Sequence, residues 1–175
     1  QYDLLIMAKT ASLLSGACET GAIRAPAEQR QAMREFGLRL GMAFQIVDDL
    51  LDYTGDATIT GKPVGADLRE HKVTLPLIYA LPRLSARQRR EVSALMDTET
   101  PTDAQIAAVV EAVTETGGLD YARERAASLS TGAEAALEVI EAAHSEPRGR
   151  IRIACPVAVA TSMLAPVLPR FMARY

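Results

Sequence analysis

The chain has 175 residues, 49% of them apolar and 23% charged, which is the balance of a globular domain and excludes a disordered or fibrous chain. A net charge of −3 gives no electrostatic basis for binding nucleic acid. Cys18 and Cys155 are isolated, match no metal-binding spacing and predict buried thiols in a reducing compartment. The uncharged run 153–168 is too short for a transmembrane segment, and no signal peptide opens the chain, so we expect a cytoplasmic protein.

The first predicted element is a helix over residues 1–23. Its apolar stripe is expected to comprise Leu4, Met7 or Ala8, Ala11, Leu14 and Cys18. A cation and a hydroxyl interrupt this face at Lys9-Thr10. A lysine on a helix is ordinarily a surface residue, so its meaning depends on its neighbours in the fold.

The second predicted helix begins near Pro26 and runs to about Tyr53, with Gly55 ending it. Apolar residues recur at steps of three and four, which predicts one stripe facing a core. A separate face carries four polar residues at i, i+3, i+4 and i+7. The apolar stripe is Met33, Phe36, Leu40, Phe44, Val47 and Leu51, and the polar face is Gln45, Asp48, Asp49 and Asp52.

The three carboxylates of this face are costly without a ligand. Aspartate is a poor residue inside a helix, like charges one turn apart repel, and the C-terminal end of the helix dipole disfavours anions. A divalent cation would reverse all three penalties, and ligands that are all oxygen atoms favour Mg²⁺. The alternative is a solvated acidic face.

A loop rich in Gly and Thr follows over 54–67. Its Gly61-Lys62-Pro63 imitates a phosphate-binding P-loop, but the spacing is wrong and no strand precedes it, so we reject nucleotide binding. Thr74-Leu75-Pro76 opens another helix, which ends near Leu81-Pro82.

Two capping boxes, Ser85 with Gln88 and Thr102 with Gln105, each start a further helix. The second of these helices stops at Gly117-Gly118, and a last long helix runs over 119–143. No alternating strand pattern stands out, so the predicted fold class is all-α. We expect one domain over 1–146, with 147–175 an Arg- and Pro-rich C-terminal segment of the same domain.

Lysines elsewhere in the sequence indicate what the carboxylate face could bind. A bound Mg²⁺ with Lys9, Lys62 and Lys72 would make a site for a polyanion with several phosphate oxygens and would neutralise a leaving diphosphate. The alternative is hydrolysis with Asp48 or Asp49 as general base, although no histidine belongs to the cluster. His71 and His144 are predicted to be structural or surface residues.

Four blocks together resemble the trans-polyprenyl diphosphate synthases. They are Lys9-Thr10, the run Gly41-x-Ala-Phe-Gln-Ile-x-Asp-Asp-Leu-Leu-Asp-Tyr53, the run Gly61-Lys62-x-x-Gly65-x-Asp67-Leu-x-Glu70-x-Lys72, and Thr74-Leu75-Pro76. The resemblance implies the C-terminal portion of an isoprenoid synthase fold, whose helices surround a deep apolar cavity. It also implies an enzyme, a prenyltransferase that ionises an allylic diphosphate and joins it to isopentenyl diphosphate, forming linear trans-polyprenyl diphosphates.

The resemblance assigns roles residue by residue. The family's second Asp-rich motif, which binds Mg²⁺, falls on Asp48, Asp49 and Asp52, and Asp67 supports the metal through water. Diphosphate contacts fall on Lys9, Lys62 and Lys72. Thr10 and Gln45 match positions close to the reacting carbon, and the family implies a homodimer, or a heteromer with a partner subunit.

Departures from the family leave alternatives open. The first Asp-rich motif and the basic residues that bind isopentenyl diphosphate have no counterpart in the chain, His71 stands where Gly is usual, and 147–175 does not match the usual last helix. A non-catalytic or truncated helical subunit is therefore a second hypothesis. A terpene cyclase is a third, disfavoured by an aromatic content of 5% and the lack of Trp.

Overall fold

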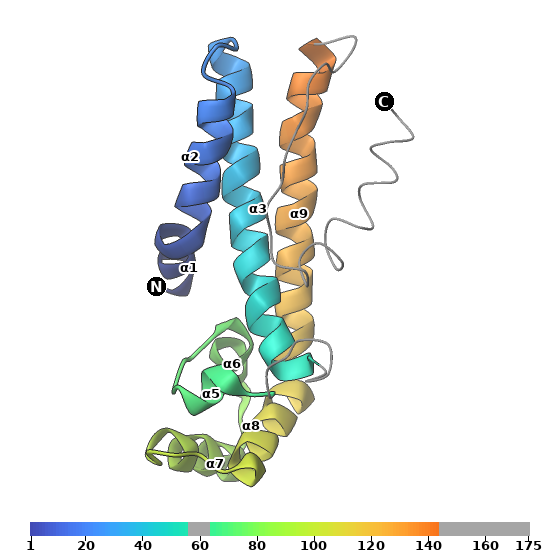
Figure 1. Cartoon of the computed structure of the whole chain (residues 1–175). Coiled ribbons are helices and arrows are strands. Elements are labelled where there is room, and N and C mark those ends of the chain that lie inside the picture. Colours follow the sequence, from blue (N-terminus) through green and yellow to red (C-terminus); the bar gives the residue numbers. More distant parts are fainter. Residues whose placement is uncertain (56–63, 144–175) are drawn as a thin grey trace.

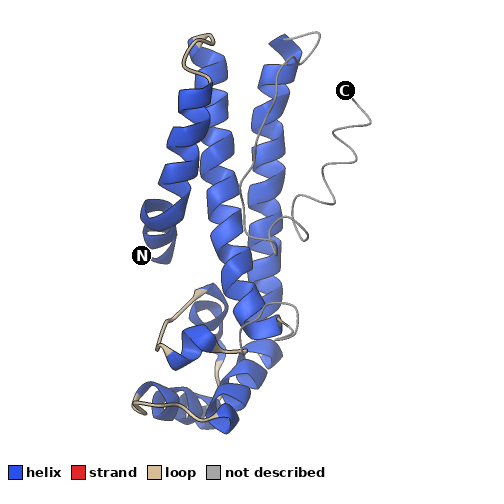
Figure 2. Ribbon diagram, viewed as in Figure 1, coloured by secondary structure: helices blue, strands red, loops and turns tan. Residues whose placement is uncertain are grey.

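The computed structural model of the chain describes residues 1–55 and 64–143. Within these ranges every regular element is a helix, which confirms the all-α prediction (Figure 2). None of the helices in these ranges is long and apolar enough to cross a membrane. The predicted diphosphate ligand Lys62, the histidine His144 and the segment 147–175 lie outside the described residues.

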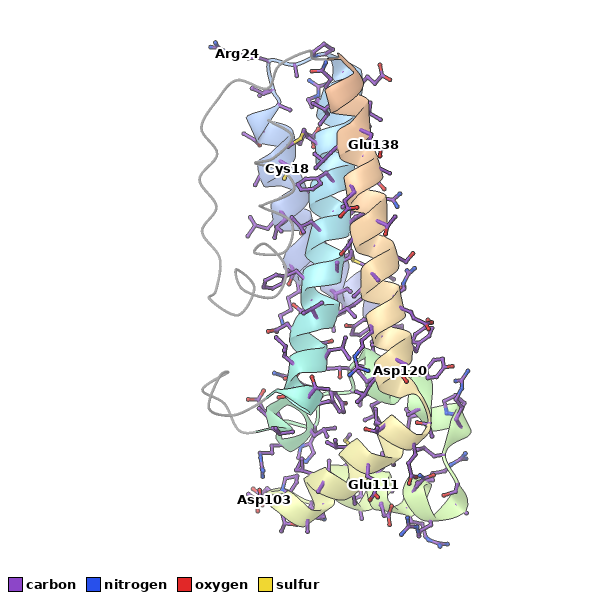
Figure 3. All side chains as sticks on the ribbon, turned by 90° about the vertical axis from the view of Figure 1, so that its right-hand side faces the viewer. Cys18, Arg24, Asp103, Glu111, Asp120 and Glu138 are labelled. Carbon is purple, nitrogen blue, oxygen red and sulfur yellow. The ribbon has the colours of Figure 1, made fainter. Side chains whose placement is uncertain are left out.

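Two long helices, together with the shorter helix α2, form the upper body of the molecule (Figure 1). Helix α3, Ala27–Thr54, lies between α2, Ser12–Gly21, and α9, Gly118–Ala143, and packs on both. The predicted ends of α3 are confirmed, since Pro26 is its N-cap and Gly55 its C-cap. Acidic side chains such as Glu111, Asp120 and Glu138 lie on exposed surfaces of the α8 and α9 region (Figure 3).

The predicted N-terminal helix is interrupted by a π-turn. Helix α1, Tyr2–Ile6, passes into the π-helix η1, Met7–Ala11, and then into α2. Because the π-turn holds one extra residue, the face that meets α3 advances by five residues at this point, from Ile6 to Ala11. The predicted stripe is therefore wrong at its start: Leu4 is 65% exposed, whereas Ile6 is 2% exposed.

The predicted apolar stripe of α3 is also only half-buried. The fully buried face consists mainly of small and polar residues, because α2 and η1 approach the helix backbone closely. A Cβ atom on Gly41 would lie 2.5 Å from the Cα atom of Ala11, and one on Gly37 would lie 2.6 Å from the carbonyl oxygen of Leu14. The buried residues of α3 are Gln29, Ala32, Gly37, Gly41, Ala43, Gln45, Ile46, Asp49, Leu50 and Tyr53.

Short helices close the lower end of the molecule beneath α3. They are α5, Ala66–Arg69, α6, Leu75–Ala80, the 3-10 turn η2, Leu81–Arg83, α7, Ala86–Met96, and α8, Asp103–Glu115. Both predicted capping boxes are confirmed: the N–H of Gln88 donates to Ser85 Oγ at 3.3 Å, and the N–H of Gln105 donates to Thr102 Oγ1 at 3.3 Å. The core below α3 is built from apolar residues that include Ile46, Leu68, Leu77, Leu95, Val109 and Val113.

Candidate functional site

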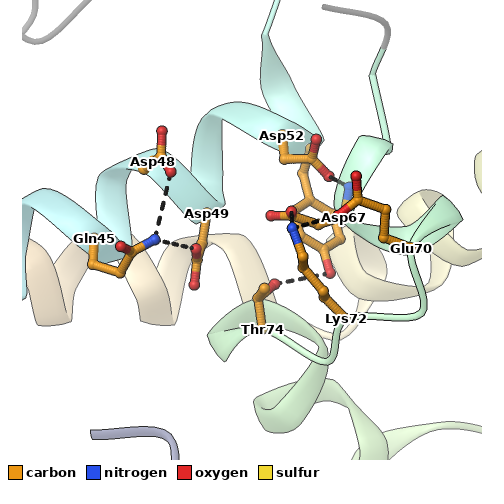
Figure 4. Close-up of polar contacts among 9 residues, drawn as sticks. Gln45, Asp48, Asp49, Asp52, Asp67, Glu70, Lys72 and Thr74 are labelled. Atoms are coloured by element: carbon orange, nitrogen blue, oxygen red, sulfur yellow. Dashed lines mark hydrogen bonds and ion pairs between the residues drawn. The ribbon is translucent and has the colours of Figure 1, made fainter. Parts of the chain in front are cut away.

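The carboxylate face lies on the last two turns of α3, directly above the short helices (Figure 4). Asp48 is exposed, Asp52 is half-buried, and Gln45 and Asp49 are buried. The helix continues to Thr54 because Gly55 then departs into extended backbone. The aspartates therefore occupy the negative end of the helix dipole, as the sequence predicts.

The first group of contacts joins α3 to the N-terminal helix. Thr10 Oγ1 donates to Gln45 Oε1 at 2.9 Å, and Gln45 Nε2 donates to Asp49 Oδ1 at 3.0 Å. Gln45 Nε2 also lies 3.5 Å from Asp48 Oδ2. The hydroxyl of Tyr2 donates to the second oxygen of Asp49 at 2.5 Å. The structure thus brings Thr10 and Gln45 together, two residues that are 35 positions apart in the sequence.

The second group joins the end of α3 to the segment that follows residue 63. The N–H of Asp67 donates to Asp52 Oδ2 at 3.0 Å, and the N–H of Gly65 donates to the carbonyl oxygen of Asp52 at 2.8 Å. Lys72 Nζ forms ion pairs with Asp67 at 3.0 Å and with Glu70 at 2.6 Å (Figure 4). Asp67 therefore connects a predicted metal ligand, Asp52, with a predicted diphosphate ligand, Lys72.

Burial changes the acidity of this site. Burial raises the pKa of Asp49, although the hydrogen bonds from Tyr2 and Gln45 oppose the rise. Burial also raises the pKa of Asp52, against the bond from the Asp67 backbone. The pKa of Lys72 is raised through its bonds with Glu70 and Asp67, so its ammonium group stays charged. The carboxylates thus carry a cost when ionised, and a cation would offset it.

The carboxylates of this site meet part of what a divalent cation requires. In residues 1–55 and 64–143, no three Asp, Glu, His or Cys side chains converge as a closed metal cage. Mg²⁺ is commonly held by one or two carboxylates, with waters and substrate phosphates completing its shell. Both oxygens of Asp49 accept hydrogen bonds, from Tyr2 and Gln45, and the backbone N–H groups of Asp67 and Ala66 interact with Asp52, whereas Asp48 is exposed. The open side of the row suits an ion shared with a phosphate ligand.

The three predicted lysines differ in their placement. Lys9 is exposed on the π-turn, beside Thr10, and has no ion pair within the described part of the chain. Lys72 is held by its two acidic neighbours, and Lys62 lies outside the described residues. The structure therefore places Lys9 on the side of Thr10 and Lys72 on the side of Asp67.

Tyr2 is the site residue that sequence reasoning missed. The signal for it is the spacing Tyr2, Ile6, Ala11, in which one step of four is followed by one of five. Without the π-turn, the same residues in a regular α-helix would place Tyr2 about 100° further around the helix axis, away from α3. π-Turns inside α-helices often occur at functional sites, and this one includes Lys9 and Thr10.

The sequence of this chain is similar to those of known proteins. Residues 1–113 match the family model described as polyprenyl synthetase. The chain belongs to the polyprenyl synthetase family. It is 40% identical over 140 residues to the all-trans-nonaprenyl-diphosphate synthase (geranyl-diphosphate specific) of Rhodobacter capsulatus, which covers 79% of this chain and 42% of that protein.

Two further proteins are similar to the chain, one in sequence and one in structure. Component 2 of the heptaprenyl diphosphate synthase of Bacillus subtilis is 34% identical over 153 residues, covering 86% of this chain and 41% of that protein. The polyprenyl synthase of Caulobacter crescentus, crystallised with calcium and isoprenyl diphosphate, superposes with a TM-score of 0.73 at 37% identity, covering 78% of this chain and 42% of that one. This family member thus spans about two fifths of the length of the curated relatives it matches.

Proposed function

We propose that this chain provides one wall of the active site of a prenyltransferase. The reaction would break the C–O bond of an allylic diphosphate, form a C–C bond with the double bond of isopentenyl diphosphate, and release a proton and diphosphate. The observation that carries the proposal is the row of carboxylates on α3, with Thr10 bonded to Gln45 at one end and Lys72 bonded to Asp67 at the other. Charged, water-soluble substrates suit a cytoplasmic enzyme.

Mg²⁺ would be held on this wall by Asp48, which is exposed, and by Asp52, which is half-buried. Asp49 and Asp67 belong to the same predicted metal site, and Asp67 would act through water. When bound, the cation would supply positive charge to the departing diphosphate. The fit rests on oxygen donors at the open side of the row, with phosphate oxygens completing the coordination.

The polar side chains around the row would divide the remaining work. Lys9, Lys62 and Lys72 would bind the diphosphate, because ammonium groups stabilise negative charge that develops on a leaving group. Thr10 and Gln45 would lie close to the reacting carbon, where their oxygens stabilise positive charge or assist removal of the proton. Lys72 would first exchange Glu70 or Asp67 for a phosphate oxygen.

The test is an assay of the full-length protein with radiolabelled isopentenyl diphosphate, an allylic primer and Mg²⁺. Asp48→Ala and Asp52→Ala should lower turnover about 100-fold or more, the loss typical of removing one preorganised electrostatic group. Glu111→Ala, on an exposed turn of α8, is the matched control and should leave turnover unchanged. Unchanged metal dependence in both aspartate variants would overturn the metal assignment.

A second candidate is a subunit of a heteromeric prenyl synthase, either non-catalytic or active only with its partner. It is supported by the similarity to component 2 of the Bacillus subtilis heptaprenyl diphosphate synthase. The chain alone should then fail to elongate a primer, because it provides one carboxylate wall, and loss of positioning costs about 7–11 kcal/mol of barrier lowering. Activity restored by a second polypeptide would support a heteromer, and activity of a single purified polypeptide that forms dimers would support a homodimer.

A further inference from the structure

Four polar side chains form one continuous line of hydrogen bonds across the contact between the N-terminal helix and α3. Tyr2 donates to Asp49, Gln45 donates to Asp49, and Thr10 donates to Gln45. Gln45 is 6% and Asp49 is 5% exposed, so water cannot freely replace these bonds. The line begins at a residue with no role in the function proposed above, Tyr2, and ends at Thr10 on the π-turn.

The donors and acceptors of this line permit a single arrangement of hydrogens. An ionised carboxylate only accepts, so Asp49 requires a donor at each oxygen. Tyr2 provides one donor, and the amide of Gln45 must present its NH₂ group as the other. The carbonyl oxygen of Gln45 then faces Thr10, so the single hydroxyl hydrogen of Thr10 must point at Gln45.

This arrangement fixes the chemical character of Thr10. Its hydrogen is used within the protein, so the free part of its hydroxyl is an oxygen lone pair, which can only accept a hydrogen or face positive charge. The opposite hydroxyl orientation would present a hydrogen, which repels a cation. The direction of the whole line depends on Asp49 being an acceptor at both oxygens.

We propose that Tyr2 is a positioning residue, which acts through Asp49 and Gln45 to keep the lone pairs of Thr10 available to a substrate with developing positive charge. This inference rests on the proposed prenyl transfer, in which the allylic carbon becomes positive as diphosphate departs. Tyr2 also keeps Asp49 turned into the protein, whereas Asp48 and Asp52 are more exposed than Asp49. Asp49 then has a positioning role too.

The π-turn explains how Tyr2 reaches its partner. It separates Ile6 from Ala11 by five residues and still keeps both against α3, where they are 2% and 0% exposed. Tyr2 lies one turn before Ile6 on the same face, which brings its hydroxyl to Asp49, 47 positions further along the chain. The two halves of the turn thus present Tyr2 and Thr10 to residues one turn apart on α3.

The test compares Tyr2→Phe with Tyr53→Phe in the full-length protein. Tyr53 is a matched control, because it is a buried tyrosine on α3 whose hydroxyl lies 3.3 Å from Thr74 Oγ1 rather than on Asp49. Two quantities are measured: hydrogen exchange of the Gln45 side-chain amide by NMR, and kcat and KM for the allylic diphosphate. Tyr2→Phe should speed the exchange about tenfold or more and lower kcat about 10- to 100-fold with KM unchanged, as for a small misplacement near the chemistry.

Asp49→Asn is the second variant, used if Tyr2→Phe does not fold, and it should speed the same exchange. Unchanged exchange of the Gln45 amide in the folded variant overturns the proposal, as does faster exchange with unchanged kcat, or a rise in KM alone. An equal loss of kcat in Tyr53→Phe also overturns it, since the effect would then be general. If the wild-type protein does not elongate prenyl chains, the proposed function fails, while the exchange measurement still decides whether Tyr2 fixes Gln45.

Discussion

Gly41 and Ala11 bring helix α3 and the π-turn into backbone contact, since a Cβ atom on Gly41 would lie 2.5 Å from the Cα atom of Ala11. This separation is far below van der Waals contact, and the obstructing atom is backbone, which cannot rotate away. The contact places Thr10, the neighbour of Ala11, within hydrogen-bonding distance of Gln45, one turn along α3 from Gly41. Close helix packing and the geometry of the site therefore depend on the same glycine.

Gly41→Ala should destabilise the protein by about 1–3 kcal/mol, the cost of overpacking a well-packed contact. It should also separate Thr10 from Gln45 and lower turnover. Urea denaturation measures the first effect and steady-state kinetics the second. Gly16→Ala is the control, because a Cβ atom there meets nothing within 4 Å, and it should stabilise the helix by about 0.4–1 kcal/mol. Equal effects of the two substitutions would contradict the packing argument.

His71 adopts a left-handed backbone conformation, with φ of 57°. This accounts for the glycine that is usual at this position in the family, since left-handed backbone costs other residues about 1–2 kcal/mol. The ring compensates in part, because His71 Nε2 lies 2.9 Å from the carbonyl oxygen of Thr98. His71→Ala should therefore lower the free energy of unfolding by about 0.5–1.5 kcal/mol, as it keeps the backbone cost and loses the contact.

His71→Gly is the informative partner of that variant. It loses the same contact and relieves the left-handed backbone, so its free energy of unfolding should exceed that of His71→Ala by about 1 kcal/mol. Thermal and urea unfolding of both variants measure the difference. If Ala proved as stable as Gly at this position, the left-handed conformation would not be the reason for the family's preference.

Asp52 should destabilise the protein in the absence of a divalent cation. Burial raises its pKa above the unfolded value, so the folded protein binds its proton more readily than the unfolded chain does. The stability associated with this group is therefore highest below about pH 4, the unfolded pKa, and falls as pH rises through the folded value. Asp52→Asn should raise the free energy of unfolding at neutral pH by about 0.3–1 kcal/mol, the size of a dipole penalty, and by less at low pH.

The measurement is urea unfolding of the metal-free protein between pH 3 and pH 8 for wild type and Asp52→Asn. Asparagine can still accept the N–H of Asp67, so the backbone contact is preserved. Asp120→Asn provides a control of opposite sign, because Asp120 lies in the first turn of α9 and pairs with Arg123. A stability gain for both variants would exclude the helix dipole and burial as the cause.

Much of this fold could be predicted from the sequence because its signals are local. Both capping boxes, the glycine that ends α3 and the proline in the first turn of α6 are decided by residues within a few positions of one another. The row of aspartates could be predicted for the same reason, since helical spacing alone places them on one face. Their assignment as metal ligands stays a prediction, and so does the deep apolar cavity.

The parts that sequence did not predict depend on contacts between distant segments. Periodicity assumes 3.6 residues per turn, so it places Leu4 in the core and misses the π-turn that buries Ile6 instead. Periodicity does not indicate that Tyr2 contacts Asp49, because the π-turn is what brings the two residues together. The buried face of α3 is similarly set by Gly37 and Gly41, whose lack of a side chain permits the close approach of α2 and η1.

Lys72 should bind a diphosphate more tightly when one of its acidic neighbours is neutralised. Its ammonium group is shared between Glu70 and Asp67, and about half of the side chain is exposed. Exposed ion pairs contribute about 0.2–1 kcal/mol, so Glu70→Gln should lower the Kd for pyrophosphate with Mg²⁺ by at most about fivefold. Lys72→Ala should raise it.

Isothermal titration calorimetry measures both Kd values. Glu91→Gln is the control, because Glu91 pairs with Arg87 on α7, away from the carboxylate row, and should leave Kd unchanged. Weaker binding in Glu70→Gln would mean that Glu70 holds Lys72 in its binding position rather than competing with the ligand for it.

Deleting Ala8 should convert the π-turn into regular α-helix without moving the residues on either side of it. The π-turn holds one extra residue, so its removal leaves Ile6 four positions from Ala11, and both still face α3. Ile6 should stay buried and Tyr2 should keep Asp49, so the free energy of unfolding and turnover should stay close to wild type. Deleting Leu4, an exposed residue of regular helix between Tyr2 and Ile6, should instead turn Tyr2 by about 100° and shift it by about 1.5 Å, so that it loses Asp49 and turnover falls. Equal turnover of the two deletion variants, measured by steady-state kinetics, would show that the position of Tyr2 does not affect the site.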